Sequence, residues 1–154
     1  MTLRLTDRVD LDLYYDIESA RFDESVRRIV TREAFKSVYA DCHSIGIECN
    51  GLDIGGVIYD GESAHIAILP SHHGRWAALL NPILVWLFSF RREIFIHLEP
   101  WNSKGLAFVE RCGWQRVGTM EDTMVYRMTP DSGSRAARVD LNGLSHCRPS
   151  RKLG

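Results

Sequence analysis

The residues with the clearest capacity for chemistry form a glycine-containing basic turn between two apolar segments. An apolar strand is predicted over residues 64–69, the sequence then reads Pro-Ser-His-His-Gly-Arg, and a long apolar helix is predicted over residues 75–88. The first turn of a helix carries four backbone N–H groups without partners and the positive end of the helix dipole. Gly74 allows close backbone approach, and Arg75 adds a fixed positive charge. The turn therefore predicts an anion site, for which a phosphate-bearing ligand is the natural occupant.

The elements around this turn follow from turn signals and hydrophobic periodicity. Residues 44–49 and 52–59 read as a hairpin across Asn50-Gly51, and Asp60-Gly61 makes a second tight turn into residues 63–69. Gly55-Gly56 inside the second strand indicates a bulge or a close backbone approach. Pro82 inside the apolar helix predicts a kink or an interruption.

The second half of the chain continues this pattern. A strand is predicted over residues 93–99, then Asn102, a short helix over residues 103–112 that stops at Gly113, and a hairpin over residues 114–128. The first three strands form an antiparallel meander, and the helix crossover makes the strand at 94–98 parallel to the strand at 64–69. The fold class is therefore α/β (an α+β mixed sheet), with a ligand expected at the carboxyl ends of the parallel pair.

The first 43 residues read as helical. A short helix with Asp7 near its start covers the apolar residues from Val9 to Ile17, and a second helix is predicted over residues 23–39. Their acidic residues either face a cationic substrate or form a solvated helix face, and the solvated face is the favoured interpretation. These acids are Asp12, Asp16, Glu18, Asp23 and Glu24.

Two sequence stretches resemble the GNAT superfamily, the GCN5-related N-acetyltransferases. They read LPSHHGRWAALL and NSKGLAFVERCGWQRVG, and the resemblance covers about residues 44–128. The family's phosphate loop has the form Arg/Gln-x-x-Gly-x-Gly/Ala, and the matching positions here are His73, Trp76 and Ala78, of which the first two depart from the pattern. The family's Glu-Lys-x-Gly-Phe run reads Glu-Arg-Cys-Gly-Trp here, from Glu110 to Trp114. Its spacing resembles the ribosomal-protein acetyltransferase branch, and Gly-Arg-Trp-Ala resembles GNAT-like proteins of phage origin.

This resemblance implies acetyl-CoA as co-substrate, bound between the strands at 64–69 and 94–98. The pyrophosphate would lie on the loop, and a backbone N–H at Ile68 or Leu69 would polarise the thioester carbonyl. Asn102 would contact the pantetheine or order the turn before its helix. The implied cofactor-binding residues are Ile68, Leu69, His73, Gly74, Arg75, Trp76, Ala77, Ala78 and Asn102.

Amide formation also needs a group that takes a proton from the amine. His65, His97 and Glu99 are the candidates, because all three lie on the strands that would border the cleft and histidine titrates near neutral pH. The family's usual general acid, a tyrosine on the last helix, corresponds to Val109. Tyr126 or a water would have to take that role.

Other classes of site find little support. Cys42, His43, Cys49, His72 and His73 have no zinc-finger spacing, so no metal site is predicted. No Gly-x-Ser-x-Gly sequence supports nucleophilic hydrolysis. A net charge of −1 gives no general attraction to nucleic acid, and the longest apolar run is too short to span a membrane. We expect a cytoplasmic protein with reduced cysteines.

The domain organisation follows from composition. A GNAT-like acyltransferase domain is predicted over residues 1–130 and a basic, disordered tail over residues 131–154. The predicted function is transfer of an acetyl group from acetyl-CoA directly to the primary amine of a small molecule or a protein. The alternatives are a GNAT-fold binding protein without catalysis and a phage accessory factor that binds protein or nucleic acid, with the tail as its nucleic-acid contact. An exposed edge strand after residue 114 is compatible with a homodimer.

Overall fold

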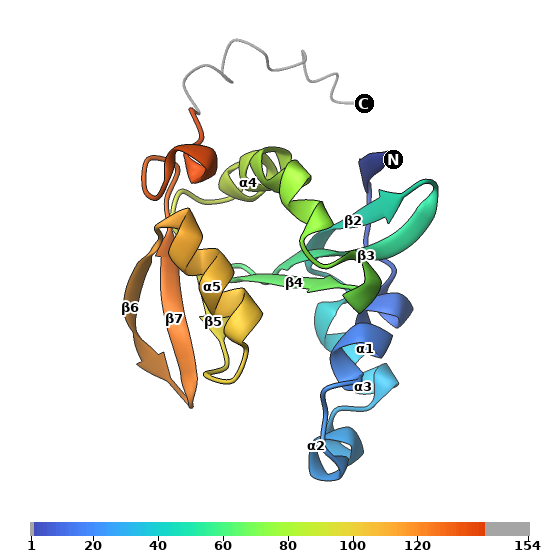
Figure 1. The fold of residues 1–154 in the computed structure, drawn as a ribbon. Helices are drawn as coiled ribbons and strands as arrows, with labels where there is room; N and C mark the ends of the chain where they lie inside the picture. Colours follow the sequence, from blue (N-terminus) through green and yellow to red (C-terminus); the bar gives the residue numbers. More distant parts are fainter. Residues whose placement is uncertain (1, 141–154) are drawn as a thin grey trace. The chain divides into compact units, whose positions relative to one another are not determined.

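The computed structural model describes residues 2–140, and the chain forms two compact units. The first unit ends at Leu80 and the second begins at Asn81. Each contains one antiparallel β-sheet with helices; the first runs from blue to green and the second from green to red in Figure 1. None of the helices in residues 2–140 is long and apolar enough to cross a membrane.

The first unit is built on a four-stranded sheet in the order β1-β2-β3-β4. Its strands are β1 (Leu3–Thr6), β2 (His43–Cys49), β3 (Leu52–Tyr59) and β4 (Ala64–Ile68). Strand β1 was not predicted, because four residues are too few for an alternating pattern to stand out. It pairs with the middle of β2, where Leu5 lies opposite Ile47.

The predicted turn and bulge in this sheet are both confirmed. Asn50 and Gly51 connect β2 to β3 with φ of 53° and 81°, as a two-residue primed turn requires. The register between β2 and β3 shifts next to Gly55, which has φ of 148°. A Cβ at Gly55 would overlap the carbonyl oxygen of Ala67 on β4, so only glycine allows the two backbones to approach this closely.

Three helices lie between β1 and β2, and their bounds differ from the prediction. They are α1 (Leu11–Ser19), α2 (Glu24–Ile29) and α3 (Arg32–Tyr39). Asp10, rather than Asp7, caps α1, with its side chain accepting from the N–H groups of Asp12 and Leu13. The single helix predicted over residues 23–39 is wrong, because the Thr31 side chain accepts from the Ala34 N–H and starts a new helix there.

Helices α1 and α3 contact each other, and α1 contacts β3 and β4 (Figure 1). The core between them is aromatic: Phe35 of α3 has its ring centroid 5.8 Å from that of Tyr14 and 5.5 Å from that of Tyr15 on α1. Val9, Ile58 and Ala67 complete this buried cluster. A helix layer is therefore fixed on the face of the sheet that carries Ala67 of β4.

The long helix predicted over residues 75–88 is interrupted, as Pro82 indicated. Two 3₁₀ turns, η1 (Pro70–His72) and η2 (Arg75–Leu79), precede the α-helix α4 (Leu80–Phe88). Pro82 lies in the first turn of α4, where the N–H it lacks would have no helical partner. The turn at Gly74, predicted to bind an anion, is therefore followed by a 3₁₀ segment and not by an α-helix.

The second unit contains a three-stranded sheet in the order β5-β7-β6. Helix α5 (Ser103–Cys112) connects β5 (Ile94–Leu98) to β6 (Gln115–Met120), and β7 (Thr123–Met128) returns as the central strand. Gly113 ends α5 with φ of 72°, and Glu121 and Asp122 form the hairpin turn with φ of 46° and 65°. The predicted helix stop and final hairpin are confirmed.

Two expectations about the sheet and the tail need correction. Within the described residues, β4 pairs only with β3 and β5 only with β7, so the predicted parallel pair does not form a hydrogen-bonded ladder. The fold also continues past residue 130. A 3₁₀ turn, η3 (Arg135–Ala137), follows, and the side chains of Ala137 and Val139 are buried. The remainder of the predicted tail, residues 141–154, lies outside the described residues.

Candidate active site

The carboxyl end of β4 presents an N–H group at an open sheet edge. The N–H of Leu69 donates to the carbonyl of Ile54 on β3 at 2.8 Å, so it is already used. In an antiparallel pair, successive residues point their N–H groups alternately toward and away from the partner strand. The N–H of Ile68, which lies opposite Gly55, therefore points away from β3. Of the two predicted carbonyl-polarising groups, Ile68 is the one oriented for that role.

His73 closes the loop that follows β4. Its Nε2 lies 3.0 Å from the carbonyl oxygen of Ile68, and because a carbonyl only accepts, this nitrogen must carry the hydrogen. The backbone N–H of His73 lies 3.3 Å from the carbonyl oxygen of Pro70, to which it donates. The side chain therefore ties the loop to the strand end, and its predicted contact with a cofactor stays a prediction.

Gly74 gives the loop the geometry of an anion cradle. It adopts the left-handed conformation, with φ of 85° and ψ of −24°, directly before η2. Such a residue followed by a right-handed turn points successive N–H groups into one concavity. The 3₁₀ helix η2 begins directly after Gly74, so the backbone of Gly74, Arg75 and Trp76 forms its first turn.

The side chains around this cradle leave it accessible. Nothing lies within 4 Å of the place where a Cβ on Gly74 would be. Arg75, Ala77 and Ala78 are exposed, while the indole of Trp76 is half-buried. The loop thus combines a left-handed glycine at the start of a helical turn, an exposed arginine and open space beside the glycine, which are features of anion-binding loops.

His65 on β4 forms a pair with Asp60 that the sequence analysis did not find. Its Nε2 lies 2.7 Å from Oδ2 of Asp60, and Oδ1 of the same carboxylate accepts from the N–H groups of Glu62 and Ser63. Partial burial would raise the pKa of Asp60, but the hydrogen bond to His65 and the two backbone bonds outweigh it and lower the pKa. The tight turn at Asp60-Gly61, which places the acid beside the second residue of the next strand, was the available signal.

The other two base candidates belong to the second unit. His97 lies on β5, with Nδ1 3.5 Å from Oγ1 of Thr123. Glu99 directly follows β5 and is half-buried, and its carboxylate has no side-chain hydrogen bond or ion pair within residues 2–140. Its lone pairs are therefore available for a proton.

Asn102 has a structural role in the same connection. Its Oδ1 accepts from the N–H of Gly105 at 3.0 Å, which makes it the N-cap of α5. A Cβ on Gly105 would lie 2.7 Å from Nδ2 of Asn102, so this cap depends on glycine there. The cap was one of the two predicted roles, and contact with a pantetheine stays a prediction.

The general-acid position offers no hydroxyl. Val109 is buried, with 2% of its surface exposed. Tyr126 on β7 donates its hydroxyl to Oε1 of Glu110 at 2.7 Å, and this bond raises its pKa together with burial. The hydroxyl of Tyr126 is therefore committed to a contact between β7 and α5.

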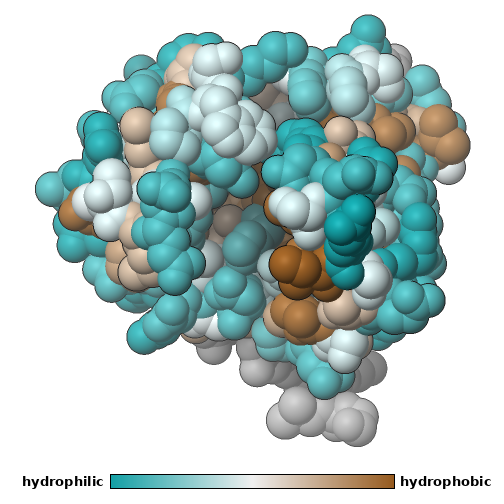
Figure 2. All heavy atoms as spheres, turned by 90° about the horizontal axis from the view of Figure 1, so that it is seen from below, coloured by the Kyte–Doolittle hydropathy of each residue, from teal (hydrophilic) through white to brown (hydrophobic). Residues whose placement is uncertain are grey.

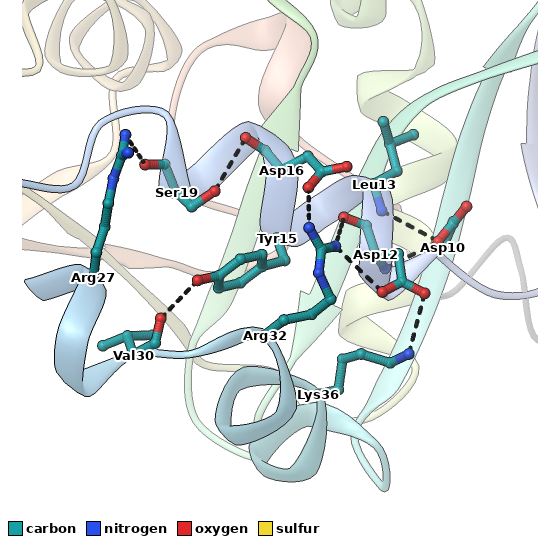
Figure 3. A network of polar contacts seen from close by, with 10 residues as sticks. All are labelled: Asp10, Asp12, Leu13, Tyr15, Asp16, Ser19, Arg27, Val30, Arg32 and Lys36. Atoms are coloured by element: carbon teal, nitrogen blue, oxygen red, sulfur yellow. Dashed lines mark hydrogen bonds and ion pairs between the residues drawn. The ribbon is translucent and has the colours of Figure 1, made fainter.

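The acidic residues of the first helices are already neutralised (Figure 3). Arg32 of α3 bonds Asp16 at 2.6 Å and Asp12 at 3.3 Å, and Lys36 bonds Asp12 at 3.1 Å. Glu18 pairs with Arg21, Glu24 lies 4.0 Å from Arg28, and Asp23 caps α2. The solvated, paired face is the interpretation that these contacts support.

Metal ligation has no geometric basis in residues 2–140. No group of three or more His, Cys, Asp or Glu side chains there could hold a metal ion. Cys42, Cys49 and Cys112 are unpaired thiols, and burial raises the pKa of Cys42 and Cys112.

Comparison with known proteins gives a structural match only. No protein-family model and no curated protein sequence matches this chain. Among solved structures, it is similar to the ribosomal-protein-S18-alanine N-acetyltransferase from Escherichia coli, with a TM-score of 0.63 at 16% identity over 87% of this chain and 97% of that one.

Two further solved structures agree. The PaiA N-acetyltransferase from Thermoplasma acidophilum, in complex with coenzyme A, has a TM-score of 0.59 at 14% identity, covering 84% of this chain and 99% of that one. A spermidine N-acetyltransferase SpeG mutant from Vibrio cholerae has a TM-score of 0.55 at 23% identity, covering 82% and 91%. These matches confirm the fold that the sequence resemblance implied, since they span most of both chains: this chain has the fold of the GNAT N-acetyltransferases.

Proposed function

We propose that this chain is an acetyl-CoA-dependent N-acetyltransferase that transfers the acetyl group directly to a primary amine. The observation that carries the proposal is the outward N–H of Ile68, followed after six residues by the N–H cradle that opens at Gly74. The first group suits a thioester oxygen and the second suits a diphosphate. Both occur in a chain with the fold of the GNAT N-acetyltransferases.

The residues present fit acetyl-CoA as the co-substrate. When bound, acetyl-CoA supplies an activated thioester. The Ile68 N–H would donate to the thioester oxygen, on which negative charge develops during attack. Gly74, Arg75 and Trp76, at the start of η2, would hold the diphosphate through backbone N–H groups. Amide formation then joins the amine nitrogen to the acetyl carbon, breaks the carbon–sulfur bond and releases the sulfur as thiolate.

Glu99 is our preferred group for the proton that the amine loses. Its carboxylate is without a side-chain partner in residues 2–140, whereas Nε2 of His65 already bonds Asp60 and His97 faces Thr123. His65 also precedes Ile68 by three residues, which is about 10 Å along a strand. That distance is too long for direct proton transfer beside the Ile68 N–H. With no hydroxyl at Val109, water would protonate the departing thiolate.

The first test is calorimetric titration of acetyl-CoA into the wild type and a Gly74→Asp variant. The substitution places a carboxylate in the cradle, so binding should weaken by at least tenfold. Gly51→Asp is the matched control, because Gly51 also has positive φ, at 81°, and open space around it, but lies in the β2–β3 turn. Equal binding by both variants would rule out the cradle.

The second test addresses catalysis. Glu99→Gln should lower kcat for acetyl transfer by roughly 10²-fold, within the range of general-base contributions, and leave acetyl-CoA binding unchanged. The matched control is Glu93→Gln, an exposed residue paired with Arg127. An unaltered kcat in Glu99→Gln would remove Glu99 from the mechanism and return His65 and His97 to consideration.

The alternative is a GNAT-fold protein that binds acetyl-CoA or a partner without catalysis. The buried Val109 favours it, because the chain lacks a hydroxyl where the fold commonly supplies a proton to the leaving group. Acetyl-CoA binding with no transfer to any tested amine would support this alternative. Absence of acetyl-CoA binding by the folded wild type would exclude the enzyme and leave a GNAT-fold protein that binds a partner.

The amine acceptor differs between the similar proteins, one being named for spermidine and another for a ribosomal-protein alanine. A spermidine-like polycation calls for unpaired carboxylates. On α1, Asp12, Asp16 and Glu18 are all bonded to cationic side chains of this chain. The paired acids therefore favour an acceptor with few charges.

A further inference from the structure

Three polar side chains share one face of the sheet where β5 ends: His97, Glu99 and Thr123. The β5–β7 register pairs Leu98 with Met124, so one step further along both strands Thr123 comes opposite the position of Glu99. Opposite residues of an antiparallel pair lie on the same face, and alternate residues of a strand share a face. His97 and Glu99 are two residues apart, so Thr123 lies on the face that carries both.

This face is not the one that α5 covers. Tyr126 bonds Glu110 of α5, and Tyr126 and Thr123 are three residues apart on β7, so their side chains point to opposite faces. His97, Glu99 and Thr123 are each half-buried. Figure 2 looks onto the molecule from the end at which β5 finishes and the β6–β7 hairpin turns, and hydrophilic side chains, in teal, predominate on the left, the side of the hairpin in Figure 1. Water can therefore exchange protons with this end of the sheet.

The hydroxyl of Thr123 determines which ring nitrogen of His97 carries a hydrogen. Its Oγ1 donates to the carbonyl of Met120 at 2.6 Å, and this bond uses the one hydrogen that a hydroxyl has. The same Oγ1 lies 3.5 Å from Nδ1 of His97, where it can only accept. Nδ1 therefore carries the hydrogen, and Nε2 of the neutral ring keeps its lone pair.

The β6–β7 hairpin holds this hydroxyl in place. Met120 and Thr123 are paired, and Glu121 and Asp122 between them form the two-residue turn with positive φ. The bond to the Met120 carbonyl then fixes the Thr123 side chain against its own turn. The acceptor for the His97 N–H is thus supplied by the backbone of the hairpin and is present before any ligand binds.

Both bases on this face keep lone pairs available. Within residues 2–140, Nε2 of His97 has no hydrogen-bond partner and the Glu99 carboxylate has no side-chain partner. The cation that β7 places on the same face, Arg127, bonds Glu93 at 3.4 Å and Gln115 at 3.0 Å. The guanidinium is therefore engaged at the far end of the strand and does not neutralise Glu99.

Acetylation of an amine that arrives as ammonium requires the loss of two protons from nitrogen. The first must leave before the nitrogen lone pair can attack, and the second leaves after the bond to the acetyl carbon has formed. The sulfur departs with the electron pair of the carbon–sulfur bond, and water protonates the thiolate. The complete reaction then releases one proton to solvent. A single carboxylate would have to pass the first proton to water before it accepted the second, whereas two bases on one face can each take one.

We infer that His97 is a second proton acceptor beside Glu99 and that Thr123 is its positioning residue. Nε2 of His97 takes the proton of the ammonium, because imidazole is a stronger base than a carboxylate. Glu99 takes the second proton, from the tetrahedral intermediate, whose positively charged nitrogen is more acidic. The proton-transfer roles rest on the proposed function, whereas the bond between His97 and Thr123 does not.

The first measurement is the tautomer of His97, read from long-range proton–nitrogen NMR spectra of the neutral histidine rings. In the wild type the hydrogen should be on Nδ1, and His97→Gln identifies the signal by removing it. Thr123→Val keeps the shape of the side chain but removes the accepting oxygen, so the hydrogen should move to Nε2. Thr123→Ser should leave it on Nδ1. A wild-type ring with its hydrogen on Nε2, or one that Thr123→Val leaves unchanged, would overturn the inference.

The second measurement is kcat for acetyl transfer. His97→Gln should lower kcat by roughly 10²-fold, and Thr123→Val by roughly tenfold because part of the general-base contribution remains. Thr123→Ser should restore the wild-type kcat. The double variant His97→Gln/Thr123→Val should be no slower than His97→Gln alone, since Thr123 acts only through His97. Losses that multiply in the double variant would show a structural role for Thr123 and contradict positioning.

Thr119→Val is the matched control. Thr119 is an exposed threonine of β6 opposite Met124, so it lies on the other face of the sheet, and its substitution should change neither the tautomer nor kcat. The two proposals fail separately. No acetyl transfer by a wild type that carries the hydrogen on Nδ1 would contradict the enzyme and uphold the bond between His97 and Thr123. Acetyl transfer that is unchanged in both His97→Gln and Thr123→Val would uphold the enzyme and overturn the inference.

Discussion

The three helices α1, α2 and α3 present two surfaces of opposite character. On one, Asp12, Asp16, Arg32 and Lys36 form a connected set of ion pairs (Figure 3). On the other, exposed Ile29 and Val38 border an apolar groove over Phe35. The charged surface looks more suited to recognition in the sequence, yet its groups already satisfy one another. The apolar surface is in contact with water, and its removal from water on binding is favourable.

The contrast shows that a count of acidic residues does not measure a binding site. A carboxylate attracts a ligand cation when no cation of the protein already neutralises it. The predictions below test whether the groove and the charged surface differ in this way, from the largest expected effect to the smallest.

Phe35→Ala should cause the largest loss of stability. Phe35 is 8% exposed and packs on Tyr14, Tyr15 and Tyr39, with ring centroids 4.8–5.8 Å apart. Removing a buried phenylalanine typically costs about 3–5 kcal/mol. Urea unfolding measures the change. A loss below about 1 kcal/mol would show that Phe35 is not the packing centre of these helices.

Much of this fold was predictable because local signals agreed with it. The Asn50-Gly51 hairpin, the bulge at Gly55 and the stop at Gly113 each depend on a backbone conformation that glycine or asparagine favours. Strand β1 and the break at Thr31 were missed for the opposite reason. The four residues of β1 are stabilised by β2, 40 residues later, and a threonine cap within an amphipathic stretch does not interrupt its periodicity.

The candidate site was predictable in position and less so in detail. The sequence predicted a turn at Gly74, and the structure has a left-handed glycine there. It could not predict that the Leu69 N–H donates to the carbonyl of Ile54 and is therefore not available to a ligand. It also missed the pair of Asp60 and His65, since their contact depends on the conformation of the turn at Gly61. Hydrogen-bond partners are set by tertiary geometry, which residue type alone does not encode.

Asp60→Asn should have a smaller, pH-dependent effect on stability, at the turn between β3 and β4. The folded-state pKa of Asp60 lies below its unfolded value of about 3.9, so its stabilisation is complete above that value and is lost as pH falls through the folded pKa. The stability difference between wild type and Asp60→Asn should therefore shrink from pH 5.5 to pH 3. Urea unfolding at several pH values measures it, and a constant difference would contradict the assignment.

Salt should distinguish Asp60 from the carboxylates of the charged surface. The Asp60 carboxylate is held by two backbone N–H groups as well as by His65, whereas Asp12 owes its lowered pKa first to the hydrogen bond from Lys36 and then to Arg32. About 1 M salt reduces the Debye length to about 3 Å and weakens exposed ion pairs. The effect of Asp60→Asn should survive in that salt.

Arg32→Met should have the smallest effect of the three and should depend most on salt. The substitution keeps an unbranched side chain near Tyr15 and removes the guanidinium that bonds Asp12 and Asp16. These groups are exposed, so the pairs contribute little even in dilute buffer, and high salt should abolish the difference from wild type. Arg28→Met is the control, because its contact with Glu24 is 4.0 Å long and fully solvated, and it should change nothing.

If Arg32→Met also improved spermidine binding, the freed acids would be able to recruit a polycation. That outcome would show that pairing, and not position, keeps the charged surface from serving as a binding site.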